Sequence, residues 1–160
     1  MALLRLRPGL KVGDPAPDFD CPDEDGKRWS LAELKGRWLV LFFYPRDNTP
    51  ICLKEACIFN DDYAEFRGLG AEVLGCSGQD AASHRRFRQA CRLQYRLLSD
   101  VDGALRRAFK TPDLLGLFPS RTTYLVDPQG VIRFVHDDRA HGDTHPALAL
   151  KALRQALSAA

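Results

Sequence analysis

The sequence has 160 residues, of which 45% are hydrophobic and 28% are charged, and its formal net charge is +2. This length and composition are typical of one globular domain, predicted here over residues 1–160, and so small a net charge gives no case for nucleic-acid binding. No apolar run approaches the ~20 residues that a membrane-spanning helix needs, so we expect no membrane segment.

The cysteines favour a reducing environment. There are five of them, an odd number with uneven spacing. The first ten residues are too short and too interrupted by Arg5, Arg7 and Pro8 to form a signal sequence. Together these features predict reduced thiols and a cytoplasmic location, since a secreted disulfide framework needs paired cysteines. Neither the cysteines nor the four histidines show metal-site spacing, so we predict no metal and no cofactor.

The N-terminal third begins with turn signals and short elements. Residues 10–21 are proline-rich and indicate an extended segment. Asp25-Gly26 is a hairpin turn signal that leads into a short strand near residues 28–30. The sequence from Ser30 to Glu33 has a capping-box pattern, and Gly36 ends the short helix that this pattern starts.

A long apolar run, Trp38 to Tyr44, follows and predicts a strand buried on both faces, as in the centre of an α/β sheet. Pro45 ends this strand. Thr49 has the chemistry of a helix N-cap, and Pro50 suits the first helical position, where no N–H is needed. Cys52 is therefore predicted in the first turn of a helix that continues to about residues 68–70.

This placement gives Cys52 a chemical role. Unpaired backbone N–H groups and the positive end of the helix dipole favour a thiolate in the first turn, and the thiolate is the nucleophilic form of cysteine. The buried stripe of the helix continues from Cys52 through Ala56, Phe59, Tyr63 and Phe66. We therefore expect Cys52 to be shielded from solvent.

The rest of the chain alternates strand and helix patterns. Strands are predicted at 72–77, 97–98, 122–126 and 131–136, and helices at about 80–91, 102–109 and 146–157; residues 127–130 have turn chemistry. The order is a β-hairpin, a βαβα unit, a second β-hairpin and a final helix. It predicts an α/β fold with one central mixed β-sheet flanked by helices.

The motif Pro45-x-x-x-Thr49-x-x-Cys52 resembles the active-site motif of peroxiredoxins. The wider run from Phe43 to Cys57 resembles the peroxiredoxin Q branch, also called bacterioferritin comigratory protein. Further similar segments, in the same order, cover nearly the whole chain; they are residues 13–19, 97–100 and 121–127. The resemblance implies a thioredoxin-like fold with an N-terminal β-hairpin extension.

The resemblance also implies a role for each motif residue. Cys52 attacks the peroxide O–O bond and becomes a sulfenic acid. Thr49 hydrogen-bonds the peroxide and the thiolate, and Pro45 shields the sulfenate from water. Arg121 supplies positive charge to the thiolate and the developing oxygen charge, and Glu55 orients the arginine.

By the same resemblance, Cys57 is the resolving cysteine, which condenses with the sulfenate to a disulfide. Cα atoms five residues apart in an intact helix lie roughly 8–9 Å from each other, whereas a disulfide tolerates at most about 7 Å. The sequence therefore predicts local unwinding between Cys52 and Cys57 in each cycle. Ile51 and Ile58 stand where glycine is common in this branch, and we expect them to affect pocket access or unwinding.

Several alternatives stay open. Cys91, on a later predicted helix, is a second candidate for the resolving role, and an outside thiol is a third. A thioredoxin-like disulfide oxidoreductase is disfavoured because the chain lacks a Cys-x-x-Cys pair. A non-enzymatic binding protein or holdase of thioredoxin fold leaves the complete motif around Cys52 unexplained.

The expected partners follow from the hypothesis that the protein is a peroxidase. The substrates are hydrogen peroxide and small organic hydroperoxides, and the resemblance implies thioredoxin or a similar dithiol as the reductant. No nucleic-acid or membrane partner is expected. The resemblance and the lack of a long exposed apolar helix predict a monomer.

Overall fold

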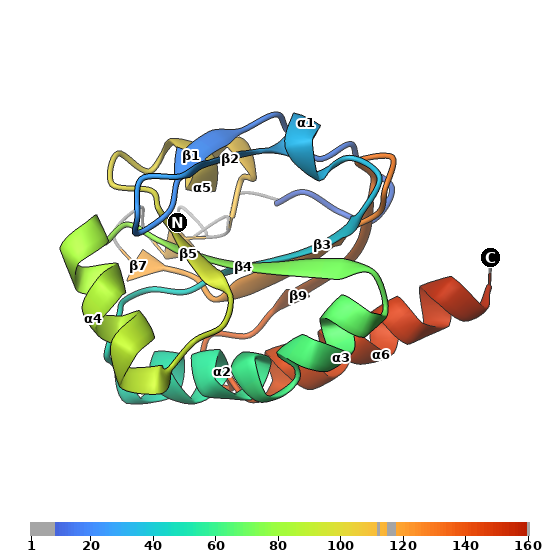
Figure 1. The fold of residues 1–160 in the computed structure, drawn as a ribbon. Helices are drawn as coiled ribbons and strands as arrows, with labels where there is room; N and C mark the ends of the chain where they lie inside the picture. The colour runs from blue at the N-terminus through green and yellow to red at the C-terminus, as the bar shows by residue number, and fades with distance from the viewer. Residues whose placement is uncertain (1–8, 112, 115–117, 160) are drawn as a thin grey trace, which may run out of the picture.

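The protein is described here by a computed structural model, in which residues 9–111, 113–114 and 118–159 are placed. A five-stranded sheet forms the centre of the fold (Figure 1). Its strands, in spatial order, are β5 (Arg96–Ser99), β4 (Ala71–Ser77), β3 (Trp38–Phe43), β8 (Thr122–Val126) and β9 (Ile132–Asp137). We predicted no signal sequence in the first ten residues, and residues 1–8 of that segment lie outside the described residues.

The sheet is mixed, as predicted. β3 runs parallel to β4 and antiparallel to β8, while β4 and β5 are parallel and β8 and β9 are antiparallel. β3 therefore has a paired strand on both sides and helices or loops over both faces, which explains its unbroken apolar sequence.

Successive side chains of β3 enter two different cores, since side chains alternate across a strand. Val40 and Phe42 pack with helices α2 (Pro50–Asp61), α3 (Tyr63–Gly68), α4 (Ala81–Cys91) and α6 (Thr144–Ser158). Leu39, Leu41 and Phe43 pack instead beneath β1 (Asp20–Pro22), β2 (Arg28–Ser30), α1 (Leu31–Leu34) and α5 (Ala104–Ala108). Figure 1 shows these two groups of elements on opposite sides of the sheet.

Two local features differ from the sequence prediction. The helix predicted from residue 50 to about 70 is interrupted at Asp62, whose φ of −91° and ψ of −2° separate α2 from α3. Phe59 and Phe66 still enter the same core, because the backbone at Asp62 stays close to helical. A short antiparallel pair, β6 (Asp113–Leu114) with β7 (Phe118–Pro119), was not predicted, since two-residue strands carry no periodic pattern.

The β1–β2 hairpin is fixed to the main sheet by the buried carboxylate of Glu24. Its Oε2 accepts a hydrogen bond from the backbone N–H of Leu97 at 2.9 Å. Its Oε1 accepts from Arg96 Nη1 at 3.1 Å and lies 3.3 Å from Arg88 Nη1. Arg88 in α4 and Arg96 in β5 therefore partly neutralise this buried carboxylate.

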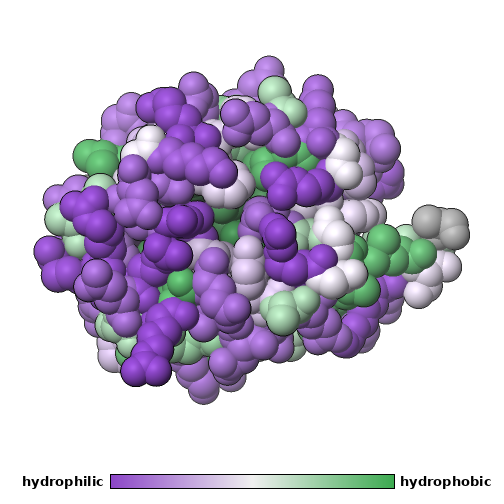
Figure 2. Space-filling model, in the orientation of Figure 1, coloured by the Kyte–Doolittle hydropathy of each residue, from purple (hydrophilic) through white to green (hydrophobic). Residues whose placement is uncertain are grey.

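The surface is mainly hydrophilic on the face shown in Figure 2, where hydrophobic areas are small and scattered, one of them along the C-terminal end of α6. In the part of the chain that the structure describes, no helix combines the length and the apolar character needed to cross a bilayer.

We expect Glu24→Ala to lower the free energy of unfolding by about 1–3 kcal/mol, because it leaves the buried N–H of Leu97 without its acceptor and removes one of the carboxylates that Arg88 and Arg96 contact. Chemical denaturation of the reduced protein measures this loss. Glu33→Ala removes an exposed carboxylate two elements away and serves as the control, with a change within about 0.5 kcal/mol. A Glu24→Ala protein as stable as the control contradicts the anchoring role.

Candidate active site

The peroxiredoxin-like motif lies where β3 passes to α2. Thr49 occupies the N-cap with extended backbone (φ −85°, ψ 149°), and Pro50 is the first residue of the helix, as predicted. The Thr49 hydroxyl does not cap the helix; it donates to the backbone carbonyl of Arg46 at 3.1 Å. Pro45 is half-buried and follows Tyr44 in the loop, two residues after the last residue of β3.

Cys52 lies in the first turn of α2 and is 1% exposed. Its sulfur accepts a hydrogen bond from Nη2 of Arg121 at 3.3 Å, across 69 residues of sequence. The buried guanidinium thus places a positive charge in direct contact with the sulfur. The structure thus brings together Cys52, the predicted reactive cysteine, and Arg121, the predicted source of positive charge.

Arg121 immediately precedes β8, and three acceptors fix its guanidinium. Nη1 donates to Glu55 Oε1 at 2.9 Å, and Nε donates to the backbone carbonyl of Arg139 at 3.1 Å, while Nη2 faces Cys52. A planar guanidinium held at three nitrogens has one orientation, so its charge is directed at the sulfur. A sequence motif does not reveal the Arg139 carbonyl as a partner of Arg121, because a carbonyl belongs to the backbone of every residue.

Glu55 lies one helical turn after Cys52 and is fully buried. Burial raises the pKa of its carboxyl to about 8, although the Arg121 guanidinium acts to lower it. Its second oxygen, Oε2, has no hydrogen-bond partner. The raised pKa weakens the pairing of Glu55 with Arg121, whose guanidinium also contacts the sulfur of Cys52.

His145 closes the far side of this cluster as a neutral ring. Burial lowers its pKa to about 4. Nε2 donates to the carbonyl of Asp138 (2.9 Å), so Nδ1 accepts from the Thr123 hydroxyl (2.7 Å). The 3.6 Å approach of Nδ1 to Glu55 Oε2 is therefore not an ion pair.

A second buried network holds the loop that carries the motif. The carboxylate of Asp47 accepts from the Tyr44 hydroxyl (2.6 Å), from Ser83 Oγ (2.8 Å) and from His84 Nδ1 (2.7 Å). Burial acts to raise the pKa of Asp47, but the hydrogen bond and the charge of His84 outweigh it and lower that pKa. His84 Nε2 also donates to the carbonyl of Leu98, which connects the loop to α4 and β5.

The loop before α6 packs directly on the first turn of α2. A Cβ added at Gly142 lies only 2.8 Å from the carbonyl oxygen of Ile51 and 3.0 Å from Cβ of Glu55. Glycine is therefore needed at residue 142 for this close approach. Ile51 itself is 43% exposed, so it borders the site without closing it on that side.

The two candidate resolving cysteines are neighbours. Cys57, on α2, and Cys91, the last residue of α4, are both half-buried, and Cys57 is one of the groups that raise the pKa of Cys91. All five cysteines are free thiols. Leu53 N–H donates to the Thr49 carbonyl at 2.8 Å, so the first turn of α2 is closed in this state.

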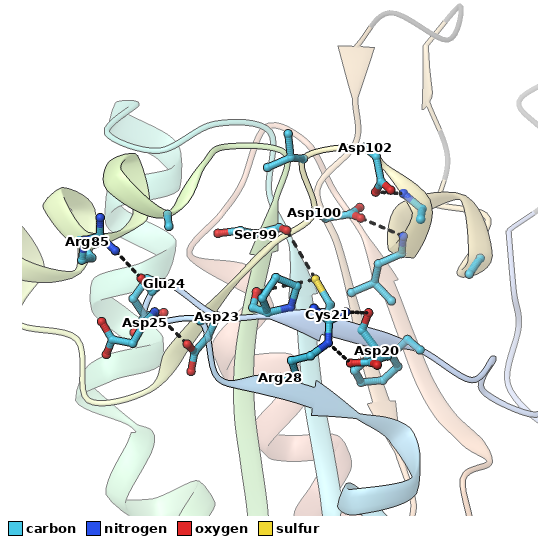
Figure 3. Close-up of a pocket in the computed structure, with 18 of the residues that line it drawn as sticks. Asp20, Cys21, Asp23, Glu24, Asp25, Arg28, Arg85, Ser99, Asp100 and Asp102 are labelled. Atoms are coloured by element: carbon cyan, nitrogen blue, oxygen red, sulfur yellow. Dashed lines mark hydrogen bonds and ion pairs between the residues drawn. The ribbon is translucent and has the colours of Figure 1, made fainter.

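A cavity of about 900 Å³ lies elsewhere, between the β1–β2 hairpin and the segment from β5 to α5 (Figure 3). It includes none of the predicted site residues. Its one thiol, Cys21, donates to the carbonyl of Ser99 at 3.6 Å, and burial raises its pKa to about 12. Cys21 is therefore a neutral thiol that packs in the core on this side of the sheet. In residues 9–111, 113–114 and 118–159 no group of three or more potential ligands is arranged to hold a metal.

Comparison with known proteins decides the family. A model of the AhpC/TSA family matches residues 12–135. The chain belongs to this family. A relative named "Putative peroxiredoxin Q, chloroplastic", from Oryza sativa subsp. indica, is 43% identical over 146 residues, which are 91% of this chain and 67% of that protein. "Peroxiredoxin Q, chloroplastic" from Arabidopsis thaliana is also 43% identical, over 92% of this chain and 68% of the relative.

Solved structures agree with this peroxiredoxin Q assignment and with the predicted thioredoxin-like fold. The peroxidoxin BcpB of Mycobacterium tuberculosis superposes with a TM-score of 0.84 at 35% identity, covering 91% of this chain and 97% of that one. A PrxQ variant from Xylella fastidiosa has a TM-score of 0.87 at 26% identity, covering 94% and 99%. The protein is a peroxiredoxin, a thiol peroxidase that reduces peroxide at the expense of a thiol.

One prediction needs correction. The cytoplasmic location inferred from the cysteines is contradicted by the comparison, because the curated peroxiredoxin Q relatives are chloroplastic proteins. Reduced thiols are compatible with more than one compartment, so the cysteine pattern does not determine the location.

Sequence reasoning missed two residues, Asp47 and His84, that hold the loop of the motif in place. Asp47 lies inside the motif run but carried no signal of its own, and His84 lies on a predicted helix with an otherwise polar sequence. Both are buried, and they meet across 37 residues of sequence. Their pairing depends on how α4 packs against the loop, which periodicity does not reveal.

We expect the stability of this peroxiredoxin to fall relative to Glu55→Gln as pH rises from about 4.5 to about 8. The folded protein keeps a proton on Glu55 that the unfolded chain releases, so its stabilising effect is complete below the unfolded pKa and lost as pH passes the folded pKa. The relative loss is on the order of 3 kcal/mol.

Urea denaturation of reduced protein at several pH values measures this difference. Glu33→Gln, which alters an exposed carboxylate, should follow the wild-type profile. Parallel profiles for wild type and Glu55→Gln across this range contradict a neutral Glu55.

Proposed function

We propose that Cys52 is the peroxidatic cysteine and that Arg121 activates it. The observation that supports this most directly is the 3.3 Å contact between Arg121 Nη2 and the Cys52 sulfur in a buried site. The thiolate attacks one oxygen of the peroxide, the O–O bond breaks, and the leaving oxygen departs as water or an alcohol after protonation. Cys52 becomes a sulfenic acid.

The remaining motif residues act on this step. Thr49, at the N-cap three residues before Cys52, hydrogen-bonds the peroxide once its hydroxyl turns from the Arg46 carbonyl. Glu55 acts through Arg121, to which it is bonded at 2.9 Å, and is a positioning residue. Pro45 shields the sulfenate from water.

Cys57 resolves the sulfenic acid in this proposal. Its thiol displaces the hydroxyl of the sulfenate as water, and a Cys52–Cys57 disulfide forms. Because five-residue spacing in a helix places the Cα atoms roughly 8–9 Å apart, the closed first turn of α2 has to open for this bond to form. Ile51, held against Gly142, is displaced in that opening.

An external dithiol, thioredoxin or a similar protein, then reduces the disulfide. Hydrogen peroxide and small organic hydroperoxides are the proposed substrates; a solved bacterioferritin comigratory protein from Xanthomonas campestris, with a TM-score of 0.81 at 29% identity over 92% of this chain and 97% of that one, is described by its alkyl peroxide reduction activity. We propose that the enzyme acts as a monomer and that residues 1–160 form one thioredoxin-fold domain.

Arg121→Gln should lower kcat/KM for hydrogen peroxide by about 10²–10³-fold, the typical effect of removing one charged or hydrogen-bonding group that stabilises a developing charge. Steady-state peroxidase assays with a dithiol reductant measure it. Arg133→Gln, in β9, removes an arginine that pairs with Asp127 away from Cys52 and should retain activity. Equal activity of the two variants contradicts the role of Arg121.

One equivalent of hydrogen peroxide added to the reduced protein should leave Cys52 in a disulfide with Cys57 as the first bridge formed. Rapid thiol blocking, digestion and mass spectrometry identify the linked peptides. Cys52→Ser should consume no peroxide on this timescale. A first bridge from Cys52 to Cys91 reassigns the resolving role, sulfinic acid without a bridge indicates an outside thiol, and an unmodified Cys52 rejects the mechanism.

A further inference from the structure

Cys91 lies near Cys57 but has no role in a catalytic cycle that uses only Cys52 and Cys57. The two thiols lie on different helices, α2 and α4, that pack against each other (Figure 1). Asn60, one turn after Cys57, donates to the carbonyl of Arg92, the residue after Cys91, so the two cysteines lie in neighbouring parts of the packed helices. Both are half-buried, so they are partly open to solvent. A Cys57–Cys91 disulfide would join two different packed helices without unwinding either of them, whereas a Cys52–Cys57 disulfide requires a helix to open.

Hydrogen bonds on both sides of Cys57 join the centre of α2 to residues 92–95, which follow Cys91. The Tyr95 hydroxyl donates to the carbonyl of Ala56 at 2.7 Å. Asn60 Nδ2 donates to the carbonyl of Arg92 at 3.1 Å, and Asn60 Oδ1 accepts from the N–H of Gln94 at 2.8 Å. Residues on both sides of Cys57 are thus bonded to the chain that follows Cys91.

These bonds determine which part of α2 opens. The turn that carries Cys52 lies before the anchored segment, and Ile51 and Leu53 in it are exposed. When Cys52 joins Cys57, the first turn therefore moves toward Cys57, and Cys57 stays beside Cys91.

We propose that Cys91 accepts the disulfide from Cys52 by thiol–disulfide exchange and so creates a second oxidised state of the enzyme. The Cys91 thiolate attacks the sulfur of Cys57 in the Cys52–Cys57 disulfide. The Cys57–Cys91 bond forms, the Cys52–Cys57 bond breaks, and Cys52 leaves as a thiolate. The proton of the Cys91 thiol passes to solvent, and no net oxidation occurs. This step rests on the proposed resolving role of Cys57.

The direction of the exchange follows from the two end states. Release of Cys52 lets the first turn of α2 close again and restores the 3.3 Å contact of its sulfur with Arg121. A thiolate that is stabilised by a guanidinium is a good leaving group in disulfide exchange. The oxidised pair then lies in a half-buried position between two intact helices, where an external dithiol reaches it.

The titration of Cys91 is consistent with this order of events. Burial, and then the hydrogen bond and the charge of Cys57, raise the pKa of Cys91 to about 12. Both effects of Cys57 disappear when its sulfur enters a disulfide. Cys91 therefore ionises more readily in the oxidised enzyme, when its attack is required, than in the reduced one.

A time course of disulfide mapping tests the exchange. Reduced protein receives one equivalent of hydrogen peroxide without a reductant, samples are quenched in acid and alkylated, and the bridges are quantified by mass spectrometry. We expect Cys52–Cys57 to form first and Cys57–Cys91 to replace it, reaching an excess of about tenfold, which corresponds to ~30 mV between the two disulfides.

Variants separate the steps. Cys91→Ser should stop at Cys52–Cys57 and lose the second bridge completely. Cys21→Ala, which removes a buried thiol on the other side of the sheet, should behave as wild type. Cys52→Ser should form no Cys57–Cys91 bridge with one equivalent of peroxide, yet should form it in a glutathione disulfide buffer, which supplies the disulfide directly.

The outcomes distinguish this inference from the proposed function. A Cys52–Cys57 bridge that persists in the wild type without a Cys57–Cys91 bridge overturns the exchange and leaves the peroxidase mechanism intact. Direct Cys52–Cys91 bonding, or the absence of any bridge at Cys52, overturns both. Failure of Cys52→Ser to form the Cys57–Cys91 bridge in the glutathione buffer also overturns the exchange.

Discussion

The active site depends on one buried guanidinium. Arg121 faces the Cys52 sulfur with one nitrogen and is fixed by Glu55 and the Arg139 carbonyl with the others. Burying a charge is unfavourable unless it is hydrogen-bonded, and here the three acceptors are a carboxyl group, a backbone carbonyl and a sulfur. Burial raises the pKa of the Glu55 carboxyl against the pull of Arg121, while the sulfur of Cys52 lies 3.3 Å from the same guanidinium.

In the proposed catalytic cycle, helix α2 stays rigid in its centre and opens at its first turn. Its centre is bonded to the segment after α4 through Tyr95 and Asn60. Its first turn carries exposed side chains and is covered by the loop at Gly142. This division explains how a cysteine in a well-formed helix can still reach a partner that lies too far away for a disulfide while the helix is closed.

The motif loop has a separate support. The Asp47 carboxylate, bonded to Tyr44, Ser83 and His84, connects the end of β3 to α4 inside the protein. A buried network that is fully paired specifies one arrangement of its members, because each unpaired group in it has a high energetic cost. It thereby fixes the position of the N-cap and, through the N-cap, that of the first turn of α2.

The sequence by itself determined the family, the order of strands and helices and the reactive end of α2, because these follow from local patterns: the apolar run before Pro45, the Thr49-Pro50 start and the spacing of Cys52 and Cys57. Arg121 was found only through resemblance, since the residue 69 positions away carries no local sign of its target. The raised pKa of Glu55, the Asp47–His84 pair and the proximity of Cys57 to Cys91 were decided by the tertiary structure alone. Burial and contacts between distant segments arise from how helices pack on a sheet, and periodicity shows which face of an element is buried but not what it meets.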